Sequence, residues 1–355
     1  MSSTIYILFM TEYINKNKGF TGILNLGNTC FLNTCLQCLN HTYELHDILN
    51  QKKIVKATSE NTILTKEWLD LTKMIWEENG IISPVRFVNA VHHVALMKNK
   101  TLFTEYSQND MCEFLLFLVD CMHESICRKV KMNITGDTEN IMDKIAVESY
   151  RLLKTIYEKE YSEIMELFYG VYVTTILDEK EKMNISMKSE HFFILDLQLF
   201  DMNDISRPYR NIYDCFEVFS KPEHMHGENA WFNENKNTKE NVIKVNVFWS
   251  LPDILVLCLK RFSPDGNRKL QHLVDFPMEG LDLCKYVKGY NSKSYIYDLY
   301  GVCNHTGGVQ GGHYYAFVKH ISGKWLHFND SEVHDCTSEI VTPYAYCLFY
   351  RKRKC

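Results

Sequence analysis

The sequence has 355 residues, of which 46% are hydrophobic and 23% are charged, as is typical of a globular protein with a sizeable core. A formal net charge of −5 gives no general attraction to nucleic acid. No apolar run reaches the length of a membrane span, and the run at residues 5–10 is too short for a signal peptide. We therefore expect neither nucleic acid nor a membrane as a partner.

Thirteen cysteines are scattered through long apolar segments and form no compact, regularly spaced framework. In a chain of this length the pattern predicts reduced thiols and a cytoplasmic or nuclear location. Cys35 and Cys38 form a CxxC pair, but no second pair or His-x-x-x-His motif accompanies it. A zinc site is therefore not expected there.

Helical patterns dominate the chain from residue 30 to about residue 165, after an irregular lead-in at residues 1–20. Ser83-Pro84 suits the cap and first turn of a helix. The expected helices cover residues 30–39, 61–78, 85–97, 108–124 and 139–167, the last as one helix or two.

β-branched and aromatic residues become enriched beyond this point and indicate strands. The expected strands cover residues 170–177, 192–199, 241–248 and 253–261, followed by strand-like sequence to residue 350. The polar residues 228–240 are expected to be an exposed loop. We therefore predict a helical lobe followed by a mostly β lobe, with a cleft between them.

The stretch from Asn25 to Asn33 is predicted to place a cysteine at the start of a helix. Gly27 and Asn28 indicate a tight turn, and fair helix formers follow Cys30. A thiol in the first turn faces unpaired backbone N–H groups and the positive end of the helix dipole, which favour the thiolate. Thr29 or Asn28 is expected to cap this helix. Taken alone, the stretch is also explained by a buried, unreactive cysteine.

A base for this thiol is predicted at His313, where a glycine-rich loop ends and a strand begins. A second strand follows Ser322-Gly323 and completes a β-hairpin. If the hairpin folds about residue 321, His313 lies opposite residue 329, whereas a loop of slightly different length selects a neighbour. Because side chains alternate along a strand, either Asn329 or Asp330 can face the imidazole, but not both. Other histidines, such as His305, are interpreted as surface or loop residues.

These residues carry a family resemblance that covers the chain from Gly22 to Arg351. The sequence resembles the ubiquitin-specific proteases, which are papain-like cysteine peptidases that remove ubiquitin. The matching motifs are Gly22-Ile23-Leu24-Asn25-Leu26-Gly27-Asn28-Thr29-Cys30-Phe31-Leu32-Asn33, Gln108-Asn109-Asp110-Met111-Cys112-Glu113-Phe114, Leu259-Lys260-Arg261-Phe262, Gly311-Gly312-His313-Tyr314 and Trp325-Leu326-His327-Phe328-Asn329-Asp330-Ser331. Several motifs in the family's order make the signal specific.

The resemblance implies an α+β, papain-like fold with a helical thumb and a β-rich palm and fingers. The catalytic domain is then residues 21–351, with the thumb at 21–165, the palm and fingers at 166–351, and a solvated basic tail at 352–355.

The resemblance also implies roles for individual residues. Cys30 matches the nucleophile, His313 the general base and Asn329 the third triad member, with Asp330 the next choice. Asn25 matches a residue whose side-chain amide helps to form the oxyanion hole. In the motif that starts the helix near residue 110, Asp110 matches an acidic residue that meets an arginine of ubiquitin's tail, and Gln108 is expected to bind nearby.

One departure from the family concerns the fingertips. Many members carry two CxxC pairs there that bind a structural zinc. The corresponding segments here, residues 177–189 and 228–241, contain no cysteine. We therefore expect no metal, with fingertips that are held by packing or locally disordered.

The function expected from these observations is hydrolysis of the bond after the last glycine of ubiquitin, without a cofactor. Two alternatives remain: a catalytically impaired module that binds ubiquitin, and an active protease on another ubiquitin-like modifier. A missing nucleophile or base would favour the first alternative, but Cys30 and His313 are both present.

Overall fold

The structure is a computed structural model that describes residues 16–51, 60–180, 184–201, 204–263, 266–308 and 311–354. Most of the expected lead-in, residues 1–15, lies outside the described residues. Helices gather in the first half of the chain: α2 (Cys30–Asn40), α3 (Tyr43–Gln51), α4 (Glu60–Glu77), α5 (Val85–Met97), α6 (Met111–Ile126), α7 (Ile141–Glu160) and α8 (Glu163–Phe168). Within these described ranges, no helix is both long and apolar enough to cross a bilayer.

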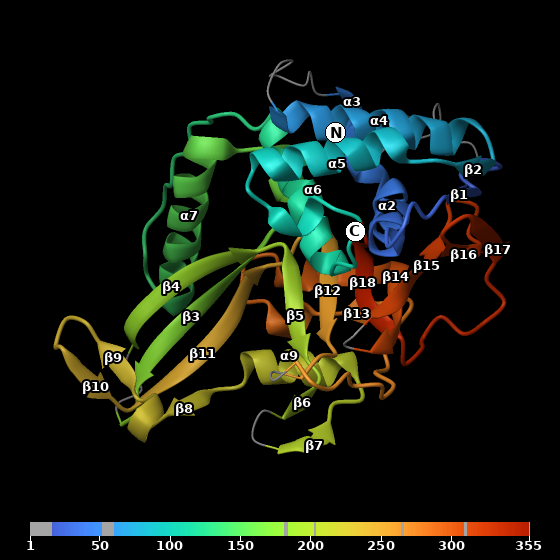
Figure 1. The fold of residues 1–355 in the computed structure, drawn as a ribbon. Helices are drawn as coiled ribbons and strands as arrows, with labels where there is room; N and C mark the ends of the chain where they lie inside the picture. The colour runs from blue at the N-terminus through green and yellow to red at the C-terminus, as the bar shows by residue number, and fades with distance from the viewer. Residues whose placement is uncertain are drawn as a thin grey trace.

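The innermost helix is α2, in which every residue from Cys30 to Asn40 is buried. Figure 1 shows it between the layer of α4 and α5 and the strands of the C-terminal half. Each of its buried amide side chains has at least one hydrogen-bond partner, although one polar atom of each remains unpaired. Gln37 Nε2 donates to the carbonyl of Thr21 at 2.9 Å, and Asn40 Oδ1 accepts from Thr72 Oγ1 at 2.6 Å. These bonds fix the helix that begins at Cys30.

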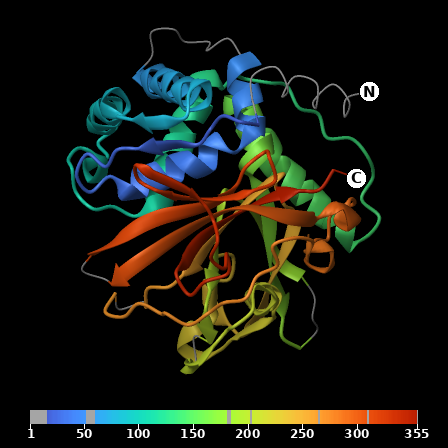
Figure 2. The same ribbon diagram turned by 90° about the vertical axis from the view of Figure 1, so that its right-hand side faces the viewer.

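The main sheet has eight strands and separates two hydrophobic cores. In β12, Val256 packs toward the helices and Leu257 packs toward the opposite core, which contains α9 (Ile212–Ser220). Because both faces are covered, β12 is a continuous apolar run. The strand order is β17 (Glu332–Asp335), β16 (Trp325–Asn329), β15 (Gly311–Lys319), β14 (Ile296–Gly308), β18 (Ala345–Lys352), β12 (Ile254–Lys260) and β5 (Ile194–Gln198), and β13 (Leu281–Asp282) pairs with β14. Figure 2 shows the blue and cyan helices of the first part of the chain on one side of the red and orange strands of this sheet.

A second, four-stranded sheet lies beside α7 and extends to the lower left of Figure 1. Its order is β4 (Asn184–Phe192), β3 (Gly170–Asp178), β11 (Val242–Ser250) and β8 (Glu223–Met225). Ala146 of α7 packs on this sheet against Val171 and Trp249. The remaining short elements are β1 (Thr21–Ile23), β2 (Gly80–Ile82), β6 (Phe200–Asp201), β7 (Asp204–Pro208), β9 (Trp231–Asn233), β10 (Thr238–Glu240), and the 3-10 turns η1 (Thr101–Phe103), η2 (Gly227–Asn229), η3 (Cys284–Tyr286) and η4 (Ser292–Ser294).

Several elements differ from the sequence-based expectation. The segment 228–240, expected to be a loop, contains part of η2 and the antiparallel pair β9–β10. Strand β4 was not expected, because it lies at a sheet edge and most of its residues are only partly buried or exposed. It therefore lacks the apolar alternation that reveals a half-buried strand.

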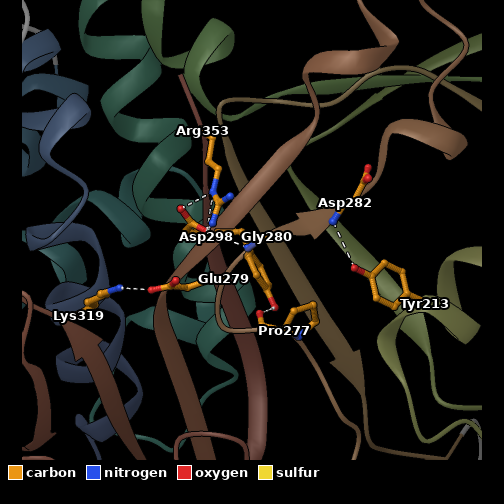
Figure 3. A network of polar contacts seen from close by, with 9 residues as sticks. Tyr213, Pro277, Glu279, Gly280, Asp282, Asp298, Lys319 and Arg353 are labelled. Atoms are coloured by element: carbon orange, nitrogen blue, oxygen red, sulfur yellow. Dashed lines mark hydrogen bonds and ion pairs between the residues drawn. The ribbon is translucent and has the colours of Figure 1, made fainter. Parts of the chain in front are cut away.

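At the basic end of the chain Arg353 and Lys354 are exposed, as the sequence predicts, but Lys352 and Arg353 also have acidic partners. Strand β18 continues to Lys352, and Arg353 binds Asp298 of β14 through three hydrogen bonds, of 2.7, 2.8 and 3.0 Å. Figure 3 shows this pair beside Gly280, whose N–H also donates to Asp298 at 2.9 Å. Arg351 lies on the helical side, where its Nε donates to Glu44 Oε1 of α3 at 2.9 Å. The basic charges thus attach the last strand to its neighbours.

We expect Glu44→Ala to lower the free energy of unfolding by about 2 kcal/mol, because it leaves the largely buried Arg351 guanidinium without its carboxylate. Urea unfolding measures the effect. A matched control is Glu77→Ala, which breaks an exposed pair with Lys73 and should change the stability by less than about 0.5 kcal/mol. Equal effects of the two substitutions would contradict this account of Arg351.

Candidate active site

Cys30 is the first residue of α2 and follows a tight turn. Gly27 and Asn28 have φ values of +106° and +55°, a left-handed backbone that glycine and asparagine adopt readily. Asn25 Oδ1 closes this turn by accepting the N–H groups of Gly27 and Thr29, at 2.9 and 3.2 Å. Thr29 occupies the cap position without capping the helix, since its hydroxyl bonds to Asn25 instead. The expected side-chain cap is therefore wrong.

The imidazole ring of His313 lies between the thiol of Cys30 and the side chain of Asn329. Its Nε2 lies 2.6 Å from Asn329 Oδ1, and the thiol of Cys30 lies near enough to the ring to raise its pKa. The interaction with Cys30 is the largest cause of the raised pKa of His313, which is about 9. Burial lowers this pKa, and the hydrogen bond to Asn329 raises it further. The charged imidazolium is therefore favoured next to the sulfur.

The hairpin that brings His313 and Asn329 together folds about residue 322, because Ala316 of β15 pairs with Phe328 of β16. The observed register therefore differs by two residues along β16 from the register expected from the sequence. A shift of two preserves the alternation of side chains, so Asn329 stays on the face of His313. The structure therefore decides between the two candidates in favour of Asn329 as the residue that contacts the imidazole.

Asp330 has a different set of contacts, in the turn after β16. It has a φ of +50°, and its two carboxylate oxygens accept from two amides. Oδ2 accepts from Asn25 Nδ2 at 3.0 Å, and Oδ1 accepts from Asn33 Nδ2 at 2.7 Å. Asp330 thus holds the amide of Asn25 beside the start of α2, and its charge also raises the pKa of His313.

A cleft of about 330 Å³ opens beside Cys30, and Gln108 and Asp110 contribute to its wall. Asp110 caps α6, since its Oδ1 accepts the N–H groups of Cys112 and Glu113 at 2.8 and 3.1 Å. Its Oδ2 accepts from the hydroxyl of Tyr346. The carboxylate is therefore held in one orientation at the edge of the cleft.

Gly308, Gly311 and Gly312 form another wall of the cleft, and Gly312 is tightly packed. A Cβ at Gly312 would lie 2.1 Å from the carbonyl oxygen of Thr306 and 2.2 Å from His305 Nε2, so only glycine fits. Lys269 Nζ donates to the carbonyl of His305 at 2.6 Å. Burial lowers the pKa of His305 to about 4, with a further contribution from the charge of Lys269. The loop is thus packed around a neutral histidine.

Sequence reasoning missed the contributions of three residues. Asn33 is part of the cysteine motif, but the sequence assigned it no role. In the structure its side-chain amide donates to Asp330. His305 was interpreted as a surface or loop residue but is only 5% exposed. Lys269 carries no local signal, since its partners lie far along the chain. The buried, strand-like residues before His305, from Val302 to Asn304, are the signal that could have identified it.

The fold and the site together define a class. A thiol at a helix start, an imidazole beside it and an amide that orients the imidazole are the arrangement of papain-like cysteine peptidases. The family model described as ubiquitin carboxyl-terminal hydrolase matches residues 21–350. The chain therefore belongs to the ubiquitin carboxyl-terminal hydrolase family, which confirms the resemblance to ubiquitin-specific proteases.

Individual relatives agree with this assignment. The chain is 33% identical over 355 residues to human ubiquitin carboxyl-terminal hydrolase 2, covering 94% of this chain and 55% of that protein. It is 31% identical to ubiquitin carboxyl-terminal hydrolase Usp2 of Drosophila melanogaster, covering 95% of this chain and 35% of that protein. The chain thus spans about half the length, or less, of these curated relatives.

Among solved structures, the SAGA Ubp8/Sgf11/Sus1/Sgf73 DUB module bound to ubiquitin aldehyde is similar, with a TM-score of 0.69 and 25% identity. The match covers 96% of this chain and 70% of that chain. It confirms the papain-like α+β fold with thumb, palm and fingers. In these terms the second sheet forms the fingers and the main sheet forms the palm.

Proposed function

We propose that this chain is a deubiquitinase, a thiol peptidase that hydrolyses the amide or isopeptide bond after the C-terminal glycine of ubiquitin. The contact of Cys30 with His313, and of His313 with Asn329, carries the proposal. Family membership directs it toward ubiquitin as the partner, and the similar structure bound to ubiquitin aldehyde supports this choice. The chemistry proposed below uses side chains and water.

In the first half of the reaction, the thiolate of Cys30 attacks the carbonyl carbon of the last glycine of ubiquitin. The oxyanion that forms is stabilised by the amide of Asn25, which Asp330 holds in place, and by backbone N–H groups at the start of α2. The imidazolium of His313 gives its proton to the leaving amine, and the C–N bond breaks. A thioester between Cys30 and ubiquitin remains.

In the second half, the now neutral His313 accepts a proton from water, and the water oxygen attacks the thioester carbonyl. The carbon–sulfur bond breaks, so Cys30 leaves as a thiolate and ubiquitin leaves with a free carboxylate. His313 is then an imidazolium again. Asn329 keeps the ring in one orientation through both halves.

The pH dependence of kcat/KM is expected to follow the raised pKa of His313. Because the pKa is about 9, the proton needed by the leaving amine is present at neutral pH and is lost as the pH rises through 9. The same sign holds for stability, where the contribution of His313 is complete below its ordinary pKa of 6.5 and disappears above 9.

Initial rates from neutral pH to about pH 10 measure the alkaline limb of this profile. In Asn329→Ala the limb should move to lower pH, because the bond to Asn329 is one of the causes of the raised pKa. A limb that stays in place in this variant would contradict the assigned contact.

The substrate's tail is proposed to lie in the cleft between Asp110 and the glycine loop. Gln108 lies against that loop, since a Cβ at Gly311 would be 2.9 Å from Gln108 Oε1. Because Gln108 and Gly311 lie so close together, the cleft suits a tail of small residues, such as one that ends in Gly-Gly. Asp110 supplies a fixed negative charge for a basic side chain of the tail.

Asp110→Asn is expected to raise KM for a ubiquitin substrate by about tenfold with a smaller effect on kcat, which corresponds to one charge-assisted hydrogen bond. Asparagine is also a good helix cap, so the substitution removes the charge and keeps an acceptor for Cys112 and Glu113. Steady-state kinetics measure KM, and thermal unfolding checks that the cap survives. An unchanged KM in a fully folded variant would contradict the proposed role.

Hydrolysis of ubiquitin that carries a C-terminal fluorogenic amide tests the proposed function. The wild type should release the fluorophore, and Cys30→Ala should not. Parallel substrates made from other ubiquitin-like modifiers test the choice of partner, and a preference for one of them would replace ubiquitin in the proposal. Ubiquitin binding without hydrolysis would show an impaired module.

A reducing intracellular compartment is also proposed, as the cysteine pattern predicts. The described cysteines, from Cys30 to Cys347, form no disulfide with one another, and most of them are buried. These thiols support a compartment that keeps Cys30 reduced.

A further inference from the structure

A cluster of two histidines and a glutamate lies at the tip of the second sheet. Glu179 follows the end of β3, and His224 lies in β8, the edge strand of the same sheet. Strand β11 lies between β3 and β8 and places Glu179 near His224. Its residue Ile243 pairs with Leu177 of β3 on one side and with His224 of β8 on the other. Figure 1 shows the end of β3 close to β8.

The two histidines of the cluster are arranged in parallel. His224 and His226 are two residues apart, so they lie on the same side of the extended chain. Their rings are stacked, with centroids 5.7 Å apart and an interplanar angle of 11°. Each ring presents one nitrogen to the carboxylate of Glu179.

The distances in the cluster fit ligands of one metal ion better than hydrogen bonds. Glu179 Oε1 lies 3.7 Å from His224 Nδ1 and 3.4 Å from His226 Nε2. Hydrogen bonds between nitrogen and oxygen are usually 2.7–3.2 Å long. Two ligand atoms on a tetrahedral zinc ion, each at 2.0–2.2 Å, are separated by about 3.3 Å. One ligand atom from each of the three residues also lies within 4.8 Å of the others.

We propose that Glu179, His224 and His226 bind a divalent transition-metal ion, with zinc the best match to two imidazoles and a carboxylate. The side chains are 34%, 56% and 47% exposed, so water can reach a fourth coordination position. The bound ion connects the end of β3 with the edge strand β8. The sequence-based expectation of no metal rested on missing cysteines and did not consider this ligand set.

Cobalt(II) is the probe that tests the site, because its visible spectrum distinguishes nitrogen and oxygen ligands from thiolates. The test uses the reduced, metal-free full chain, which has thirteen cysteines that could compete. We expect one equivalent of cobalt with a spectrum free of sulfur charge-transfer bands, and displacement of cobalt by zinc. Glu179→Gln should weaken binding about tenfold, and the combined His224→Ala and His226→Ala variant by about 100-fold or more.

His334→Ala is the matched control, because His334 is also an exposed histidine near a carboxylate, 3.9 Å from Glu332. It should bind cobalt as the wild type does. Circular dichroism of each variant shows that the fold is kept. Failure of the wild type to bind cobalt, a thiolate spectrum, or equal binding by the double variant would overturn the proposal. The hydrolysis assay is read separately, so failure of the metal site leaves the proposed function intact.

Discussion

Replacing His313 with alanine is expected to lower kcat for hydrolysis of a ubiquitin amide by about 10³-fold or more, because one residue supplies the base, the acid and the counter-ion of the thiolate. The structure places its ring between the thiol of Cys30 and the side chain of Asn329. Its pKa near 9 keeps it charged at neutral pH. Loss of the ring removes the charge that stabilises the Cys30 thiolate, so alkylation of Cys30 by iodoacetamide should also become slower.

His334→Ala provides the control for this experiment as well, since it lies on the exposed strand β17. It should retain the wild-type kcat. A loss of less than about tenfold in His313→Ala would show that another group acts as the base. Single-turnover measurements separate the chemical step from product release and therefore give the clearest value.

Asn25→Ala is expected to lower kcat by about 10²–10³-fold with little change in KM, because its amide meets an oxyanion that exists only during the reaction. Asp330 should act through the same residue. Its Oδ2 accepts from Asn25 Nδ2, so deletion of the carboxylate frees that amide. Asp330→Gly is the suitable deletion, because glycine tolerates the φ of +50° at this position.

A double-mutant cycle distinguishes this positioning role from a direct one. If Asp330 acts through Asn25, Asp330→Gly should cost little when Asn25 is already alanine. The alkaline limb of the pH profile adds a second readout: it should move further in Asn329→Ala than in Asp330→Gly, because Asn329 bonds to the ring of His313. Strictly additive losses would contradict the positioning role.

Much of the site could be predicted because its signals are local. Gly27 and Asn28 mark a turn before Cys30, and the structure has that turn with positive φ at both residues. A histidine after glycines at the start of a strand predicted a partner on the next strand. The exact hairpin register was wrong by two residues, yet the alternation of the strand still presented Asn329 to His313.

What could not be predicted depends on contacts between distant segments. Asp330 forms hydrogen bonds with Asn25 and Asn33, which lie some 300 residues earlier in the chain. These bonds form only when the hairpin packs against the start of α2 and the turn before it. The pairing of Arg353 was missed for the same reason, because its partner Asp298 lies in β14. A run of basic residues at a chain end looks solvated until its partners are known.

The central claim is that Cys30, among thirteen cysteines, is the nucleophile toward ubiquitin. The most direct test is reaction of the reduced protein with ubiquitin that carries a C-terminal electrophile, followed by peptide mapping of the adduct. We expect one ubiquitin per chain, attached at Cys30, with no adduct in Cys30→Ala and a much slower reaction in His313→Ala. An adduct at another cysteine, or no adduct with the wild type, would contradict the account.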